Sequence, residues 1–121
     1  MKDFLSIPSE RIIFKNEYFF IIKDIYPVSE GHLLIISNKL KEDYFELSNK
    51  EKENLSEVIL KAKSLIELEH SPDGYNIGMN CGKYAGQTIF HFHCHIIPRY
   101  KGDIENPTGG VRGVIPNKMK Y

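Results

Sequence analysis

Short runs of β-branched and aromatic residues, separated by turn residues, mark the first third of the chain. Residues 11–14 and 18–23 are two such runs with Lys-Asn-Glu between them, which predicts a hairpin. Residues 24–31 contain a proline, a serine and a glycine, and they predict a turn. Residues 32–37 are mostly apolar at consecutive positions, which predicts a third strand buried on both faces.

The apolar pattern then changes to a helical period. Ser48 and Glu51 have the spacing of a capping box, in which each side chain bonds the backbone amide of the other residue. The following segment carries Lys and Glu on one face and apolar residues on the other. The apolar positions are Leu55, Val58, Ile59, Ala62, Leu65 and Ile66. This pattern predicts a helix over residues 49–69, ended by the Ser-Pro-Asp-Gly sequence at 71–74.

Strand patterns return after the helix. Residues 75–80 and 88–98 predict a fourth and a fifth strand, and the glycine-containing residues 81–86 predict the loop between them. Residues 104–121 are rich in glycine and proline and predict an irregular segment. Strands, one long helix and further strands are typical of an α+β fold with a mostly antiparallel sheet. We expect one domain over residues 1–121, with its core at about residues 11–103.

Composition and charge exclude several classes of protein. The chain is 41% hydrophobic and 26% charged, as globular domains are, and sixteen basic residues balance sixteen acidic ones. That balance disfavours non-specific nucleic-acid binding, and no apolar run approaches the ~20 residues of a membrane span. The first eleven residues lack the apolar core of a signal peptide. The only cysteines, Cys81 and Cys94, form no CxxC motif, and we expect a cytoplasmic protein without a structural zinc.

Three histidines within five residues carry the chemical signal. His91, His93 and His95 alternate with apolar residues at 92, 94 and 96. Because side chains alternate between the two faces of a strand, the histidines should share one face, roughly 6 to 7 Å apart. Cys94 should lie on the opposite, apolar face as a buried and unreactive thiol.

Such a row of imidazoles has three interpretations. The histidines could be structural, although strict alternation of three is unusual for that role. They could bind a metal, but the outer pair would lie ~13 Å apart along a strand, and a further ligand would be needed. They could perform phosphoryl or nucleotidyl transfer, in which one imidazole attacks phosphorus while others bind phosphate oxygens or hold its tautomer. The glycines and the glutamine before the histidines favour the third interpretation.

The segment resembles the signature of the histidine triad (HIT) family, His-φ-His-φ-His-φ-φ with φ apolar, at residues 91–97. The preceding Ala-Gly-Gln-Thr and the following Pro-Arg-Tyr-Lys-Gly-Asp are most similar to its fragile-histidine-triad-like branch, which contains diadenosine polyphosphate hydrolases. Residues 21–36 resemble the other half of the family's site. The resemblance implies a HIT-like fold, namely a five-stranded antiparallel sheet with one long and one short helix. It also implies a homodimer joined through the long helix and the fourth strand.

The resemblance implies a role for each matching catalytic residue. His93 takes the place of the nucleophile that attacks the α-phosphate and becomes a nucleotidyl-histidine. His95 takes the place of a phosphate contact, His91 and His32 take the places of supporting histidines, and Gln87 takes the place of an amide beside the leaving group.

Nucleotide binding is implied at further positions. Asp24 matches a ribose-binding position, Asn80 a polar position near the phosphates, and Thr88 a hydroxyl beside the triad. The loop at Lys83 and Tyr84 would meet the leaving group. The family's base pocket is resembled by Ile13, Phe14, Phe20 and Ile22.

The implied reaction is hydrolysis at the α-phosphate of a nucleoside 5′-phosphate derivative, such as a diadenosine polyphosphate. It needs no metal or other cofactor, although Mg²⁺ could accompany a polyphosphate as counter-ion. The implied partner is a purine nucleotide, and we expect neither nucleic acid nor membrane. Two alternatives remain open from the residues: an adenosine phosphoramidase of the same family, and a nucleotide-binding or scaffolding protein with little turnover.

Overall fold

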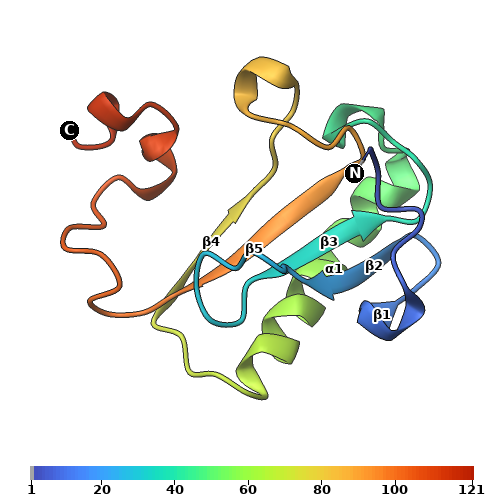
Figure 1. The fold of residues 1–121 in the computed structure, drawn as a ribbon, viewed down its shortest axis with the longest axis horizontal. Helices are drawn as coiled ribbons and strands as arrows, with labels where there is room; N and C mark the ends of the chain where they lie inside the picture. The colour runs from blue at the N-terminus through green and yellow to red at the C-terminus, as the bar shows by residue number, and fades with distance from the viewer. Residues whose placement is uncertain (1) are drawn as a thin grey trace.

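The computed structural model describes residues 2–121, so Met1 of the predicted domain lies outside the described residues. The chain forms one antiparallel sheet in the order β1-β2-β3-β5-β4 (Figure 1). The strands are β1 (Ile12–Lys15), β2 (Phe19–Lys23), β3 (Leu33–Ser37), β4 (Gly74–Gly78) and β5 (His93–Arg99). The last strand, β5, thus lies between β3 and β4 rather than at an edge. This position brings its histidines beside residues from earlier parts of the chain.

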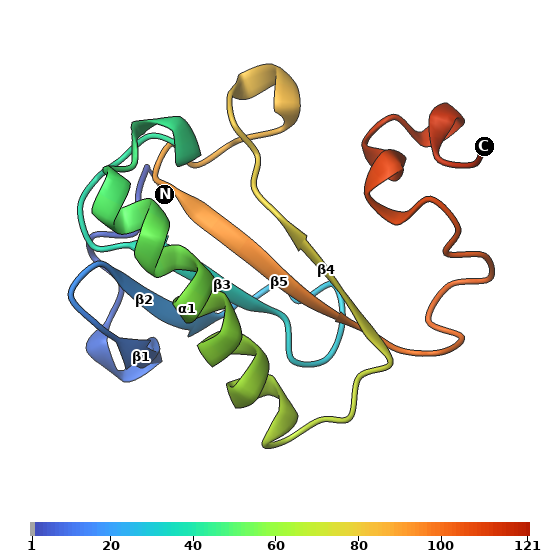
Figure 2. The ribbon, with the colours of Figure 1, turned by 180° about the vertical axis from the view of Figure 1, so that it is seen from behind.

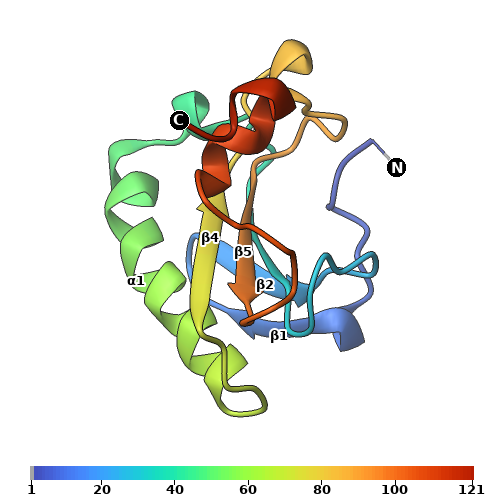
Figure 3. The ribbon, with the colours of Figure 1, turned by 90° about the vertical axis from the view of Figure 1, so that its left-hand side faces the viewer.

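One long helix, α1 (Asn49–Glu67), covers one face of the sheet (Figures 2 and 3). Its first turn is capped as predicted, since the Ser48 hydroxyl accepts from the Glu51 amide and the Glu51 carboxylate accepts from the Ser48 amide. The residues described contain this one α-helix, and the other helical segments are 3₁₀ turns of three to five residues. The expected short helix therefore takes the form of 3₁₀ turns. No helix within residues 2–121 has the length and apolar character needed to cross a membrane.

The two faces of the sheet carry two apolar clusters. The helix-side cluster packs strand residues such as Phe19, Ile35, Phe92 and Cys94 against α1. The opposite cluster is smaller and is covered by the N-terminal segment instead of a helix. Its buried members are Phe4, Phe20, Ile22, Leu34 and Ile36. The second face is therefore the one left partly open, and it is the face of the histidines.

Most predicted boundaries agree with the structure to within two residues, and β5 is the exception. The predicted fifth strand begins at Thr88, whereas β5 begins at His93. The reason is a contact with a distant loop, because the Phe92 amide donates to the Lys41 carbonyl and not to a neighbouring strand. His91 consequently lies just before the strand, in irregular backbone.

The C-terminal segment, residues 104–121, is irregular as predicted, with two 3₁₀ turns at Gly110–Val114 and Pro116–Lys118. Figures 1 and 2 show it extending away from the sheet beside β4. Within the described chain, the hydrogen bonds of residues 106–121 join positions inside this segment. Its contact with the domain is made by the first turn against β4.

Candidate active site

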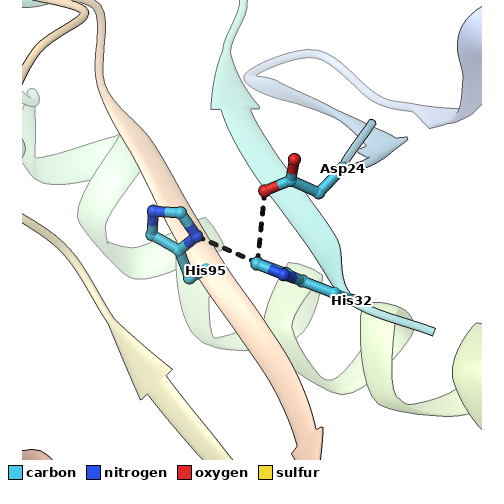
Figure 4. A group of neighbouring side chains, drawn as sticks. All are labelled: Asp24, His32 and His95. Atoms are coloured by element: carbon cyan, nitrogen blue, oxygen red, sulfur yellow. Dashed lines mark hydrogen bonds and ion pairs between the residues drawn. The ribbon is translucent and has the colours of Figure 1, made fainter. Parts of the chain in front are cut away.

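The site lies where β2 ends and β3 begins, next to the stretch of β5 that pairs with β3. Asp24 follows β2, His32 precedes β3, and His95 lies opposite Leu34 in the β3–β5 pairing. Figure 4 shows the three side chains converging, with the His32 ring between the other two. Residues 63 positions apart in sequence thus form a continuous polar contact on the open face of the sheet.

The hydrogen bonds assign the tautomer of His95. The Val28 amide donates to His32 Nδ1 at 3.0 Å, so that His32 carries its proton on Nε2. His32 Nε2 lies 3.0 Å from His95 Nδ1 and 3.4 Å from a carboxylate oxygen of Asp24. His95 Nδ1 therefore accepts, and the His95 proton is on Nε2. His95 thus presents an N–H donor to whatever binds on this face.

A second set of bonds assigns the tautomer of His93. The Phe4 amide donates to His91 Nδ1 at 3.0 Å, and His91 Nε2 donates to the Ser37 carbonyl at 2.8 Å. His93 Nδ1 in turn donates to the carbonyl of His91 at 2.8 Å. The proton of neutral His93 is thus on Nδ1, and Nε2 keeps a lone pair. An imidazole nitrogen in this state is a nucleophile.

Burial keeps the supporting histidines neutral. Desolvation lowers the pKa of His32, despite the nearby Asp24 carboxylate, and it lowers the pKa of His91, despite the bond to the Ser37 carbonyl. Desolvation, with the neighbouring His93 and His32, lowers the pKa of His95 to about 4. Neutral rings are what the two tautomer assignments require.

These lowered pKa values predict a loss of stability in mild acid. The unfolded chain binds protons on His95 near pH 6.5, whereas the folded chain does so only near pH 4, so stability present above pH 6.5 is lost as the pH falls between these values. His95 alone should contribute a loss of about 2 kcal/mol at pH 5 relative to pH 7.5. Urea unfolding at these two pH values measures this difference. A His95→Gln variant should show a smaller difference, and an equal difference in both proteins would contradict the assignment.

Gln87 lies in the loop before the triad, and its carboxamide bonds backbone groups. Its side chain is buried, its Oε1 accepts from the Gly82 amide, and its Nε2 donates to the carbonyls of Glu42 and Ile89. With its carboxamide bonded to backbone at both ends, Gln87 has no group left for a leaving-group oxygen. In this arrangement Gln87 holds the loop before the triad in shape.

Asn80 and Thr88 are both exposed, with no hydrogen bond from either side chain to residues 2–121. Asn80 and His95 line the same hollow of about 470 Å³, whose other walls are β4 and the C-terminal segment. Thr88 does not line it. The expected leaving-group residues Lys83 and Tyr84 also lie elsewhere, with Tyr84 almost fully exposed.

The four expected base-pocket residues separate onto different surfaces. Phe20 and Ile22 lie in the cluster on the histidine face. Phe14 packs against the helix-side cluster instead, because a bulge in β1 shifts the register between Ile12 and Phe14. Ile13 is partly exposed at that bulge. A base on the histidine face would meet Phe20 and Ile22 but not Phe14.

Asp24, His32 and His95 also have the proximity of metal ligands, with one donor atom from each within 4.8 Å of the others. The hydrogen bonds disfavour metal binding, since His32 Nε2 is protonated and donates its hydrogen bond to His95 Nδ1. Without rearrangement, His32 has no lone pair for an ion there. The three residues fit a proton-holding network better than a metal site.

Some residues of the site could not be found from the sequence pattern. Phe4, Ser37 and Val28 act through backbone groups on His91 and His32. Any residue type has these backbone groups, so no motif marks them. Their contribution depends on long-range packing alone.

An antiparallel sheet whose interior strand β5 carries alternating histidines, supported by a His–Asp pair from the connection between β2 and β3, defines a histidine triad domain. A model of the HIT domain matches residues 6–102. The chain belongs to the HIT family.

Relatives support this assignment across several organisms. An uncharacterized HIT-like protein of Methanocaldococcus jannaschii is 36% identical over 100 residues, which covers 83% of this chain and 76% of that protein. A bis(5′-adenosyl)-triphosphatase of Dictyostelium discoideum is 34% identical, covering 83% of this chain and 67% of that protein. The crystal structure of a HIT family protein from Bacillus anthracis has a TM-score of 0.71 at 37% identity, covering 76% of this chain and 65% of that chain. The chain thus spans about two thirds to three quarters of the length of these relatives.

Proposed function

We propose that this protein hydrolyses a nucleoside 5′-phosphate derivative at its α-phosphorus through a nucleotidyl-histidine intermediate. The observation that carries the proposal is the pair of tautomers on β5. His93 offers a lone pair on Nε2, and His95, one strand position along the same face, offers an N–H on Nε2. A nucleophile beside a hydrogen-bond donor is what attack on a phosphoryl group requires.

The reaction proceeds in two displacements. The lone pair of His93 Nε2 attacks the α-phosphorus, a P–N bond forms, and the bond to the leaving group breaks with its electron pair on the leaving group. His95 Nε2–H donates to a phosphate oxygen on which negative charge increases in the transition state. Water then attacks phosphorus and loses a proton to solvent, the P–N bond breaks with its electron pair on His93 Nε2, and a nucleoside monophosphate is released.

The orientation of the substrate follows from the strand order. Asp24 lies on the β2 side of the triad, and the apolar Phe20 and Ile22 lie on the same side. A ribose on Asp24 places the base against this cluster and the leaving group on the β4 side, beside Asn80. A relative named bis(5′-adenosyl)-triphosphatase supports a dinucleoside polyphosphate as substrate.

A specific observation favours phosphoramidate hydrolysis as a second candidate. The hollow next to His95 is walled by apolar side chains such as Ile77, Ile97, Val111 and Val114. No lysine or arginine occurs among the described residues that line it. Such a surface suits an uncharged amine leaving group better than a polyphosphate chain.

Product analysis tests the function and separates the candidates. The purified protein is incubated with diadenosine tri- and tetraphosphate and, separately, with an adenosine phosphoramidate, and AMP release is followed by chromatography. Release of AMP from either class supports the α-phosphate reaction, and the faster class identifies the leaving group. Binding of AMP without turnover of any substrate would contradict hydrolysis and support a nucleotide-binding role.

Ribose recognition by Asp24 gives a separate prediction. One Asp24 oxygen accepts from the Tyr26 amide and the other faces His32, so the carboxylate is fixed in place. Hydrogen bonds to a charged acceptor contribute ~1.5–3 kcal/mol, so substrates without ribose hydroxyls should react about 10- to 100-fold less efficiently in kcat/KM. Asp24→Asn should keep the bond to Tyr26 and reduce this discrimination. Equal discrimination in both proteins would remove Asp24 from the ribose site.

A further inference from the structure

The N-terminal segment covers the part of the sheet next to the triad. Residues 2–8 precede the first strand and lie on the face opposite α1 (Figure 3). Phe4 anchors the segment, because its side chain is 5% exposed and packs in the cluster formed by β2 and β3. A terminal segment is ordinarily held weakly, so this degree of burial indicates a specific attachment.

Phe4 contacts the triad in two ways. Its amide donates to His91 Nδ1 at 3.0 Å in a buried bond between residues 87 positions apart. Its ring meets the rings of His91 and His93 edge-on, with centroids 5.6 and 5.1 Å apart. The hydrogen bond from the Phe4 amide is independent of the Phe4 side chain, whereas the ring contacts depend on it.

The hydrogen bond from the Phe4 amide determines the tautomer of His91. With Nδ1 accepting from Phe4, the His91 proton is on Nε2, where it meets the Ser37 carbonyl at the end of β3. The ring is fully buried with both nitrogens occupied. Without the Phe4 donor, Nδ1 would be a buried acceptor without a partner, which is unfavourable. The alternative tautomer would place a lone pair against the Ser37 oxygen.

His91 transmits this constraint to the nucleophile through its own backbone. Its carbonyl accepts from His93 Nδ1 at 2.8 Å, and this bond keeps the lone pair of His93 on Nε2. His91 lies outside the ladder of β5, so its carbonyl is not oriented by strand pairing. The ring bonds to Phe4 and Ser37 are what fix it.

We propose that the backbone amide of Phe4 is a positioning group for the nucleophile, acting through the tautomer and carbonyl of His91. The Phe4 amide is therefore part of the active site, although no side-chain motif marks it. The kinetic consequence rests on the proposed function, whereas the tautomer consequence does not.

Substitutions at one position separate the amide from the ring. Phe4→Ala removes the ring and keeps the N–H, while Phe4→Pro removes both. A misplaced nucleophile costs up to about 10²-fold, so we expect Phe4→Pro to have a kcat 10- to 100-fold below that of Phe4→Ala, with similar KM. Leu5→Pro is the matched control, because Leu5 is exposed and its amide bonds only the surface Asp3; it should retain wild-type kcat.

Two-bond ¹H–¹⁵N spectra of histidine-labelled protein give a readout that needs no substrate. The wild type and Phe4→Ala should show His91 protonated at Nε2 and His93 at Nδ1, and Phe4→Pro should lose this His91 pattern while its circular dichroism stays native. Wild-type His91 protonated at Nδ1 would overturn the proposal, and this result stands even if Phe4→Pro does not fold. Equal kcat for Phe4→Ala and Phe4→Pro would overturn it as well. Native tautomers in a protein that turns over no nucleotide would instead count against the proposed function alone.

Discussion

Replacing His93 by alanine is expected to lower kcat by about 10⁴-fold or more, because the variant has no atom that can form the covalent bond to phosphorus. Binding of a nucleoside monophosphate should change little, since Asp24, His95 and the apolar face remain. Single-turnover kinetics with the preferred substrate measures the loss. Mass spectrometry of acid-sensitive adducts should detect a nucleotidyl group on the wild type and none on His93→Ala.

His70→Ala provides the matched control for this experiment. His70 follows the C-terminal end of α1 and contributes nothing to the bonds among the four histidines of the site. We expect its kcat to remain within about twofold of the wild type. Turnover by His93→Ala close to the wild-type rate would show that His93 is not the nucleophile.

The largest loss of stability is expected from Phe92→Ala. Phe92 lies between the first two histidines of the triad, but it points into the helix-side core, where it is 1% exposed and its ring packs on Phe19 at 5.9 Å. Truncating a buried phenylalanine costs ~3–5 kcal/mol through lost transfer energy and the cavity left behind. Urea unfolding should show a lower midpoint with an unchanged m-value.

A surface valine supplies the comparison. Val111 is 64% exposed in the C-terminal segment, so Val111→Ala should change the unfolding free energy by less than about 0.5 kcal/mol. If Phe92→Ala lowered the unfolding free energy as little as Val111→Ala, the segment just before β5 would not be anchored through the core. Activity measured at urea concentrations below the unfolding transition of Phe92→Ala shows how far the Phe92 side chain also positions His91 and His93.

The succession of strands and helix along the chain could be predicted because the pattern of each element is local. The capping box at Ser48 and the consecutive apolar residues of β3 each specify one element without knowledge of its neighbours. The start of β5 could not be predicted, because it depends on whether the Phe92 amide meets a strand or the Lys41 carbonyl. The bulge that turns Phe14 toward α1 is likewise a property of strand pairing and not of composition.

The site divides in a similar way. Alternation predicted a shared strand face for His91, His93 and His95. The structure places His93 and His95 on the open side of β5 with ring centroids 5.4 Å apart, whereas His91 precedes the strand and is fully buried. The backbone partners of Gln87 could not be predicted, because one of them is the carbonyl of Glu42, 45 positions away in the sequence. Phe4 was invisible for the same reason, since its part is played by an amide. Side-chain chemistry can be seen in the sequence, whereas backbone chemistry becomes visible only after folding.

The position of β5 between β3 and β4 has a consequence for how the sheet folds. β5 follows the other four described strands in the sequence, yet it pairs with both β3 and β4, and β4 has no other partner among the residues described. A nascent chain that ends before His93 therefore holds a three-stranded remnant and an unpaired β4. Such high contact order slows folding. Completion of the sheet and formation of the histidine row therefore coincide, because both require β5 up to Arg99.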